Sequence, residues 1–410
     1  MSTLSLALRN IFRNRRRTLF TLTAIMIGIM ALVLFDGFVR YTLWGLQEST
    51  IRNGLGHLQL ATAENYFTTG NFDPFRYLFT DQEEIVSKLQ ALPEVKSVVP
   101  QVTFAATLAS AEKSGIVMVQ ALPAEFSRSL LSFRQIVAGR DLQAEDRYRV
   151  VLARGVAEKI GAKIGDTLTM MVITRNGGLN AADLEVVGIA SLGLRELDNI
   201  QVYLDLSTAM DFLDITSVPL LITVLEKTEY TGQVKETITQ AFNGKTGQPL
   251  VVKAWDELAD YYQQVQGFYD TLLQIIRFII MLVVIFTIIN TMTMSVLERT
   301  REIGALRAIG TQQNGIVQLF LAEGLWIGLL GGISGVLLGL VVSSLINNLF
   351  GGIYIPPPPG MAEGYQAFFA PSAATVGRNF LLALVVAVLA SLYPAYKGAK
   401  LKIADSLRYL

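Results

Sequence analysis

The segment "LLQIIRFIIMLVVIFTIINTMTM", residues 272–294, carries a single charged side chain, Arg277. A helix needs roughly 20 mostly apolar residues to cross the ~30 Å hydrocarbon layer of a membrane. Stretches of the same character occur elsewhere in the chain. We therefore expect an α-helical membrane protein with four transmembrane helices, at residues 18–38, 271–297, 316–350 and 378–396.

The composition of the whole chain supports a membrane protein. Of its 410 residues, 51% are hydrophobic and 17% are charged, whereas a soluble domain has roughly 25% charged residues. The formal net charge is zero, so no basic field indicates a nucleic-acid partner. Cysteine is absent, which excludes disulfide frameworks, cysteine-based zinc sites and thiol catalysis.

The basic residues beside the four spans predict the orientation of the chain. They lie before the first span, between the second and third, and after the fourth, while the loop 351–377 has no Lys or Arg. By the positive-inside rule, the segments 1–17, 298–315 and 397–410 are cytoplasmic and 39–270 lies outside. The basic residues are Arg9, Arg13, Arg15, Arg16, Arg17, Arg299, Arg301, Arg307, Lys397, Lys400, Lys402 and Arg408.

The two ends of this arrangement have further features. Residues 1–17 are basic and amphipathic, which predicts a helix lying along the inner membrane surface. No small-residue cleavage motif follows the first span, so we expect an uncleaved membrane anchor.

The outer segment, residues 39–270, is long enough for a folded domain. Short β-prone runs alternate in it with helical patterns and turn residues such as the NGG at 176–178. This indicates an extracytoplasmic α+β domain with two lobes. We expect a β-rich lobe at about 123–215, inserted into a lobe that both flanks build.

The connection between this domain and the second span has helical periodicity. Apolar and aromatic residues recur at steps of three and four without an intervening proline. This predicts one continuous helix over 255–297, projecting roughly 25 Å beyond the bilayer as a stalk. A surface helix folded back on the domain is the alternative. The stalk residues are Trp255, Leu258, Tyr262, Val265 and Tyr269.

The segment 298–315 combines charge with a small apolar face, because Ile303, Leu306 and Ile309 fall near one side of a helix. Gly304 and Ala308 leave room for a partner. This pattern suits docking onto a cytoplasmic protein. A turn that merely connects two spans remains the alternative.

The third span contains overlapping G-x-x-x-G pairs, which allow close helix packing and favour architecture over a pore. These glycines are Gly328, Gly331, Gly332, Gly335 and Gly339. Polar groups are few in the spans. Asp36, Arg277 and Glu323 fall near span ends, where we expect interfacial placement.

Chemistry-bearing motifs are weak. His57 is the single histidine and cannot by itself build a catalytic zinc site. The segment NGKTG at 243–247 has Thr239 where a phosphate-binding loop requires glycine. We therefore predict no catalytic residues, no metal and no cofactor in this chain.

Two long stretches carry a family resemblance. "VLERTREIGALRAIGTQQNGIVQLFLAEGLWIGLLGGISGVLLG", residues 296–339, resembles the signature of the FtsX-like permease family, the membrane subunits of MacB-type and lipoprotein-releasing ABC transporters. "YPAYKGAKLKIADSLRYL" at 393–410 is similar to that family's tail. "PEVKSVVP" at 93–100 and "VVLARGVAEKIGAKIGDTLTM" at 150–170 look like its outer domain. The proline run 356–359 matches no family feature.

The resemblance implies a non-catalytic permease subunit in a bacterial inner membrane, with its large domain in the periplasm. ATP and Mg would be bound by a separate cytoplasmic ATPase. The family's coupling element falls on Arg301, Glu302, Ile303, Gly304, Leu306, Arg307, Ala308 and Gly310.

The implied mechanism is mechanotransmission, in which hydrolysis moves the outer domain and thereby extracts or exports a lipoprotein, lipid or other envelope substrate. A second permease would complete a homo- or heterodimer, and a periplasmic carrier or adaptor is a further implied partner. Two alternatives stay open. One is tripartite efflux of an antibiotic or peptide, and the other is a signalling subunit that controls a partner such as a cell-wall hydrolase.

Overall fold

The structure, a computed structural model, describes residues 3–13, 15–70, 72–242, 248–356 and 364–400. It divides into two compact units. The helical unit comprises Met1–Trp44, Val265–Tyr354 and Gln366–Leu410, and the sheet unit comprises Gly45–Gln264 and Ile355–Tyr365. The tail 401–410, most of the proline run and the NGKTG segment lie outside the described residues.

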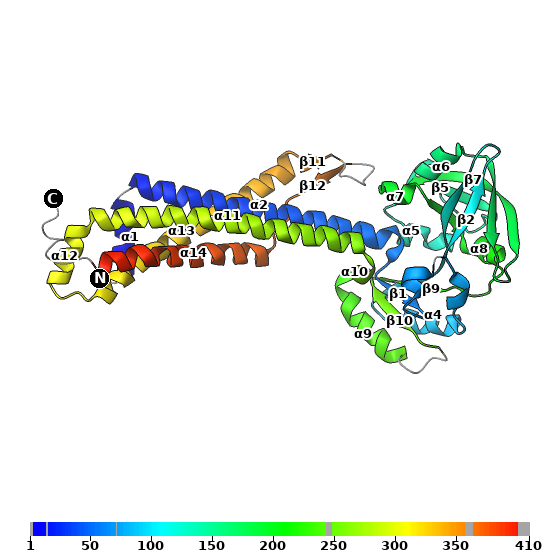
Figure 1. Ribbon diagram of the computed structural model, residues 1–410, viewed down its shortest axis with the longest axis horizontal. Coiled ribbons are helices and arrows are strands. Elements are labelled where there is room, and N and C mark those ends of the chain that lie inside the picture. Colours follow the sequence, from blue (N-terminus) through cyan, green and yellow to red (C-terminus); the bar gives the residue numbers. More distant parts are fainter. Residues whose placement is uncertain (1–2, 14, 71, 243–247, 357–363, 401–410) are drawn as a thin grey trace. The chain divides into compact units, whose positions relative to one another are not determined.

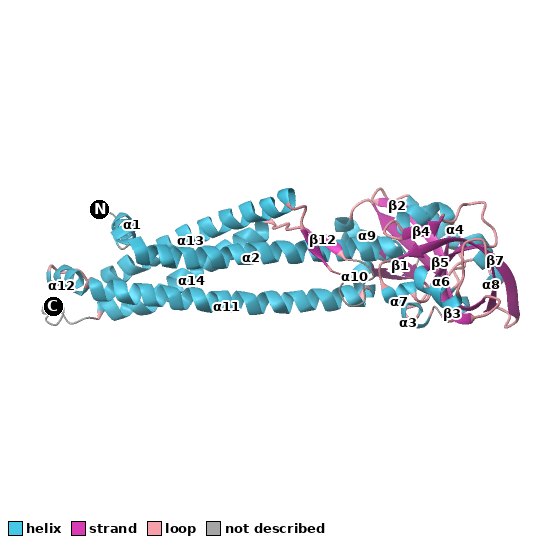
Figure 2. Ribbon diagram, turned by 90° about the horizontal axis from the view of Figure 1, so that it is seen from above, coloured by secondary structure: helices cyan, strands magenta, loops and turns pink. Residues whose placement is uncertain are grey.

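Four long helices form the helical unit and lie side by side in both ribbon views (Figures 1 and 2). Each is long and apolar enough to cross a membrane, which confirms the predicted class of fold. They are α2 (Arg15–Thr50), α11 (Asp260–Glu298), α13 (Gln313–Leu349) and α14 (Ala373–Ala399). The short helix α1 (Thr3–Arg13) precedes α2, and the short helix α12 (Thr300–Ala308) connects α11 to α13.

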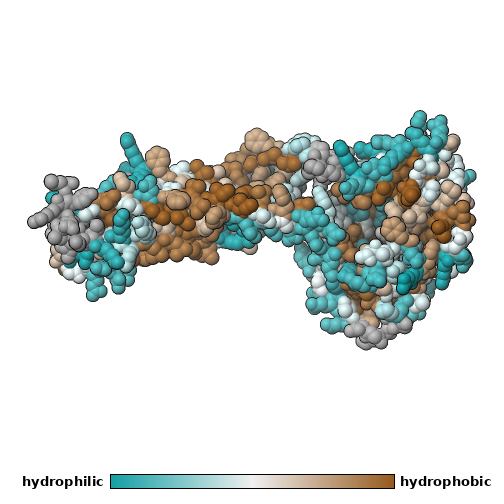
Figure 3. All heavy atoms as spheres, in the orientation of Figure 1, coloured by the Kyte–Doolittle hydropathy of each residue, from teal (hydrophilic) through white to brown (hydrophobic). Residues whose placement is uncertain are grey.

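The outer surface of these helices remains apolar while their inner seam forms a core. Residues such as Ile29, Ile288 and Ala387 are buried together in that core. On the face drawn in Figure 3, brown apolar residues cover the helices, and hydrophilic residues gather at the end that carries α12. An apolar exterior is what a lipid environment requires.

Helix α13 packs through two rows of glycine. A Cβ on Gly331, Gly335 or Gly339 would come within 2.8–2.9 Å of side-chain carbons of α2. Gly328 and Gly332 instead face α14, where a Cβ would meet Ala387 Cβ at 2.8 Å or the Phe380 ring at 3.0 Å. The predicted glycine set therefore lies at two interfaces within this chain, one with each neighbouring helix.

The sheet unit contains ten strands in one mixed sheet, in the order β10-β1-β9-β2-β3-β8-β5-β7-β4, with β6 paired to β2 and β7. Most neighbours are antiparallel, whereas β3–β8 and β5–β7 are parallel. The strands are β1 (Leu58–Ala61), β2 (Val95–Ala109), β3 (Ser114–Leu122), β4 (Gln135–Gly139), β5 (Arg149–Ala153), β6 (Thr167–Ile173), β7 (Leu179–Ser191), β8 (Gln201–Asp205), β9 (Leu220–Leu225) and β10 (Val251–Ala254).

Helices cover this sheet and complete the α+β fold, which confirms the prediction. The helices are α3 (Tyr66–Thr69), α4 (Gln82–Gln90), α5 (Ser127–Leu130), α6 (Arg154–Ile160), α7 (Arg195–Asp198), α8 (Leu206–Leu213), α9 (Thr231–Phe242) and α10 (Trp255–Leu258), with short turns η1 (Ile51–Leu55), η2 (Pro74–Tyr77), η3 (Ala124–Phe126) and η4 (Thr228–Tyr230). The loop between α13 and α14 contains the short strands β11 (Ile353–Ile355) and β12 (Tyr365–Ala367).

Strand β2 joins the two lobes. Its first half pairs with β9, while its second half pairs with β3 and β6. Strand β3, assigned to the first lobe from the sequence, therefore belongs with the inserted strands. The structure places the start of the inserted lobe inside β2, near residue 102, because a strand long enough to serve both halves carries no turn signal at the boundary.

The helix predicted over 255–297 is interrupted. Ala259 has φ −95° and ψ 68°, outside the helical region, and separates α10 from α11. Ala259 is buried in a small cluster with Ile51 and Trp255. The prediction of a continuous helix was wrong at this residue, because packing onto η1 overrides the helical periodicity.

Candidate coupling site

The short helix α12 lies between two long spans and is bounded by two breaks. Arg299, with φ −106° and ψ 17°, ends the helical path of α11. After α12, Gly310 has φ +100°, a conformation that glycine adopts without steric cost. The two breaks let the chain turn from α11 into α12 and then into α13.

The two sides of α12 differ in exposure. Ile303 is 2% exposed and packs in the core of the helical unit, and Gly304 is also buried. Leu306 and Ile309 point outward, with Ile309 82% exposed. The three apolar residues predicted to share one docking face therefore lie on two sides of α12. Ile303 packs inward against its own chain, whereas Leu306 and Ile309 are exposed.

The remaining predicted coupling residues are mostly on the outer side. Arg301, Glu302, Ala308 and Gly310 are exposed. Arg307 is half-buried, and its Nη1 donates a hydrogen bond to the backbone oxygen of Ala399 at 3.2 Å. The exposed apolar side chains of α12 and its C-cap are thus Leu306 and Ile309, with charged and small neighbours.

A buried ion pair holds this helix in place. Arg299 Nη1 lies 2.6 Å from Glu323 Oε1 of α13, and both side chains are almost fully buried. The Arg299 guanidinium also lies over the Phe320 ring, 5.5 Å from its centroid. A buried charge is stable only when it is paired and hydrogen-bonded. The pair therefore fixes the start of α12 against α13.

Helix α1 joins the same network. Asn10 Nδ2 donates to Glu323 Oε1 at 2.8 Å, and Arg13 Nη1 donates to Glu302 Oε1 at 2.7 Å. Partial burial alone would raise the pKa of Glu302, but the hydrogen bonds from Arg13 and Arg299 outweigh it and hold this pKa below its usual value. Glu302 is consequently ionised at neutral pH and links α1 to α12.

The contact between α1 and α13 was missed from the sequence, which predicted only a membrane-surface helix. Ala7 and Ile11 are buried, and Trp326 Nε1 donates to the backbone oxygen of Leu4 at 3.1 Å. A partial signal was available, because Glu323 lies in an apolar span and requires a polar partner.

A second buried polar cluster ties three helices near the other end of the unit. The carboxylate of Asp36 on α2 accepts from Arg277 Nη2 of α11 at 2.8 Å and from Asn379 Nδ2 of α14 at 2.6 Å. Arg378 Nη2 lies 3.7 Å from Asp36 Oδ1. Asp36 and Glu323, which the sequence places near span ends, are therefore buried and hydrogen-bonded between helices of the bundle.

The predicted stalk residues occupy two settings. Trp255 is buried and its ring lies 4.8 Å from that of Tyr262, edge to face. Leu258 and Val265 are half-buried. Tyr269 packs against Phe38 of α2, with ring centroids 6.3 Å apart. Aromatic packing thus joins α10 to the start of α11 through Trp255 and Tyr262, and α11 to α2 through Tyr269 and Phe38.

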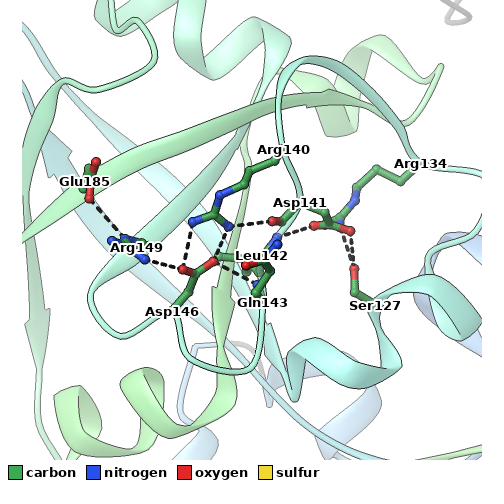
Figure 4. A network of polar contacts seen from close by, with 9 residues as sticks. All are labelled: Ser127, Arg134, Arg140, Asp141, Leu142, Gln143, Asp146, Arg149 and Glu185. Carbon is green, nitrogen blue, oxygen red and sulfur yellow. Dashed lines mark hydrogen bonds and ion pairs between the residues drawn. The ribbon is translucent and has the colours of Figure 1, made fainter.

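The most conspicuous polar network of the sheet unit has a structural role (Figure 4). Arg140 and Arg149 both donate to the buried carboxylate of Asp146. The hydrogen bond from Arg140 is the main reason that the pKa of Asp146 lies far below its usual value. A second group joins Arg134, Ser127 and Asp141. These contacts fix the connection from β4 to β5.

The described residues form no candidate metal site. None of their His, Asp and Glu side chains gather in a group of three that could hold an ion. Burial and the nearby Arg52 lower the pKa of His57 to about 4. His57 Nδ1 instead accepts from the Leu225 backbone N–H at 3.2 Å, which makes it part of the sheet core.

Two family models match the chain. The model of the MacB-like periplasmic core domain covers residues 18–241, and that of the FtsX-like permease C-terminal covers residues 275–403. The first match alone spans more than half of the chain. The chain belongs to the MacB-type, FtsX-like permease family. It is therefore an ABC transporter permease, and the second match includes α12 and the Arg299–Glu323 pair.

Relatives agree with this assignment. The lipoprotein-releasing system transmembrane protein LolE of Haemophilus influenzae is 27% identical over 79% of this chain and 80% of its own. An uncharacterized ABC transporter permease of Methanocaldococcus jannaschii is 25% identical over 99% of this chain and 97% of its own. The macrolide export ATP-binding/permease protein MacB of Sodalis glossinidius is 25% identical over 98% of this chain, which matches 60% of that relative.

These relatives are components of ABC transporters, a class that implies an ATPase partner. The membrane-spanning helices and the periplasmic-type domain fit a bacterial inner membrane.

Proposed function

We propose that this permease works by mechanotransmission. A separate cytoplasmic ATPase docks on α12, and its movements pass through α11 and α2 to the sheet unit, which releases a lipoprotein or related envelope substrate. The observation that carries the proposal is the attachment of α12: a buried ion pair between Arg299, at the junction of α11 and α12, and Glu323 of α13 fixes the end of α11, the helix whose other end belongs to the sheet unit. Similarity to LolE over most of both chains favours the lipoprotein-releasing branch.

The network around Glu323 suits force transfer. Arg299 directly follows Glu298, the last residue of α11, and its ion pair with Glu323 connects this junction to α13. Arg13 and Asn10 add α1 to the same assembly. A push on α12 would therefore act on α1, α11 and α13 together, since bending at the junction would break buried charge-assisted hydrogen bonds.

The docking face is tested by replacing its two outward apolar residues. We expect Leu306→Ser with Ile309→Ser to weaken binding of the partner ATPase by about tenfold or more, because apolar anchors dominate interface energy. The matched control is Ile116→Ser with Ile173→Ser, two exposed residues of the sheet unit. Titration of the ATPase onto permease in detergent gives the affinity. Unchanged affinity in the α12 variant would place the docking site elsewhere.

We also propose that both termini and α12 face the cytoplasm while the sheet unit is extracytoplasmic. The motivation is the cluster of arginines at the α1–α12 end of the bundle. Cysteine introduced at Gln312 of this cysteine-free chain should resist a membrane-impermeant thiol reagent in intact cells, whereas cysteine at Ile173 should react. Labelling at Gln312 but not at Ile173 would reverse the orientation.

A further inference from the structure

The amino-terminal helix α1 is held in a defined position beside the transmembrane helices. Ala7 and Ile11 are buried, and Trp326 and Glu323 of α13 bond to Leu4 and Asn10. On the α2 side, Thr18 Oγ1 donates to the backbone oxygen of Ile11 at 2.7 Å. Because Thr18 begins the apolar stretch of α2, α1 lies at the level where that helix meets the headgroup layer.

The five arginines of this region separate into two groups. Arg13 pairs with Glu302 and Arg17 pairs with Glu298, so two of the cations are neutralised within the chain. The other three, Arg9, Arg15 and Arg16, are exposed and form no hydrogen bond or ion pair with any residue that the structure describes. These three cations are available to an external anion.

Exposed apolar side chains accompany them. Leu4 and Leu6 of α1 are exposed, and so are Leu19 and Phe20 at the start of α2, with Phe20 77% exposed. Apolar side chains next to unpaired arginines at the headgroup level match the chemistry of a lipid monolayer, which offers acyl chains beneath phosphates. A protein partner would not require apolar residues that continue directly into the membrane span.

We propose that Arg9, Arg15 and Arg16 form a binding surface for the headgroups of anionic lipids in the adjoining leaflet. Arg13 and Arg17 do not take part, because their charges serve the network around α12. The surface is distinct from the proposed ATPase-docking face, which consists of Leu306 and Ile309. Since α1 is bonded to Glu323, lipid bound here would stabilise the helix on which the network depends.

A fluorophore on cysteine at Leu6 tests the proposal in vesicles of phosphatidylcholine. Spin-labelled phosphatidylglycerol or spin-labelled phosphatidylcholine is added at equal mole fraction, and quenching is compared. We expect the anionic quencher to be several-fold more effective, since one cation near an anionic surface contributes about fivefold. High salt should remove the preference, because the Debye length falls to about 3 Å at 1 M.

Two variants in the Leu6→Cys background decide the assignment. Arg9→Gln with Arg15→Gln and Arg16→Gln should abolish the anionic preference. The matched control Arg76→Gln with Arg175→Gln and Arg195→Gln, three exposed residues of the sheet unit, should retain this preference. Equal quenching by both lipids in the parent, or a preference that survives the first variant, would overturn the proposal. So would loss of ATPase affinity in the first variant without any change in quenching, because the arginines would then serve the ATPase.

Discussion

Two buried carboxylates, Asp36 and Glu323, show what single residues do in this permease. Each lies inside an otherwise apolar bundle and accepts hydrogen bonds from an arginine and an asparagine on other helices. The sequence places these groups near span ends, where lipid headgroups could equally well satisfy them. Their partners lie hundreds of positions apart in three of the four contacts, so residue spacing could not predict the pairs.

Removal of one partner of the Arg299–Glu323 pair should destabilise the protein more than removal of both. We expect Glu323→Leu to lower the free energy of unfolding by about 3–5 kcal/mol, because the buried Arg299 loses its buried counter-charge and keeps only the half-exposed Glu302. The double variant Arg299→Met with Glu323→Leu should lose less of the free energy of unfolding, since no uncompensated buried charge remains. Denaturant unfolding of the detergent-solubilised proteins measures both. A double variant at least as unstable as the single one would contradict the assigned role of the pair.

At the scale of elements, apolar length predicted the four spans, and β-prone runs alternating with helical patterns predicted an α+β domain. They did not predict β4 at Gln135–Gly139, whose residues are exposed or half-buried and give no alternation of apolar and polar side chains. The break at Ala259 was also unpredictable, because its cause is packing on Ile51, which is distant in sequence. The glycine pattern of α13 predicted close packing but not the two partner helices.

Replacement of glycine by alanine should destabilise the protein at Gly335 of α13 and stabilise it at Gly267 of α11. In Gly335→Ala, the new Cβ would lie 2.8 Å from Ile29 Cβ and from the Met26 backbone oxygen, so we expect destabilisation by about 1–3 kcal/mol. In Gly267→Ala on α11, the Cβ meets nothing within 4 Å, so higher helix propensity should stabilise by up to about 1 kcal/mol. Thermal unfolding in one detergent compares the two. Equal shifts would show that α13 does not depend on the close approach.

At the scale of the whole molecule, mechanotransmission requires that force pass along α11 between α12 and the sheet unit. Helix α11 runs without interruption from Asp260 to Glu298, and its last residue adjoins the Arg299–Glu323 pair. Proline within its first half would remove a backbone hydrogen bond and clash with the preceding turn, which costs about 3 kcal/mol or more and kinks the helix. Gln266 suits this test because it is exposed and precedes the apolar run.

Proline at the start of the same helix provides the control. Asp260 is the first helical residue after Ala259, a position where the missing N–H of proline is not needed. Asp260→Pro should therefore leave the helix intact, so that any defect specific to Gln266→Pro reports the kink and not the presence of proline.

The most direct measurement records ATP hydrolysis and release of bound substrate in the same proteoliposomes, with the permease and its ATPase reconstituted together. For Gln266→Pro, we expect ATPase binding and hydrolysis to continue while substrate release falls by at least about tenfold. Asp260→Pro should keep both activities. Substrate release by Gln266→Pro at the parental rate, with hydrolysis unchanged, would contradict transmission of force through α11.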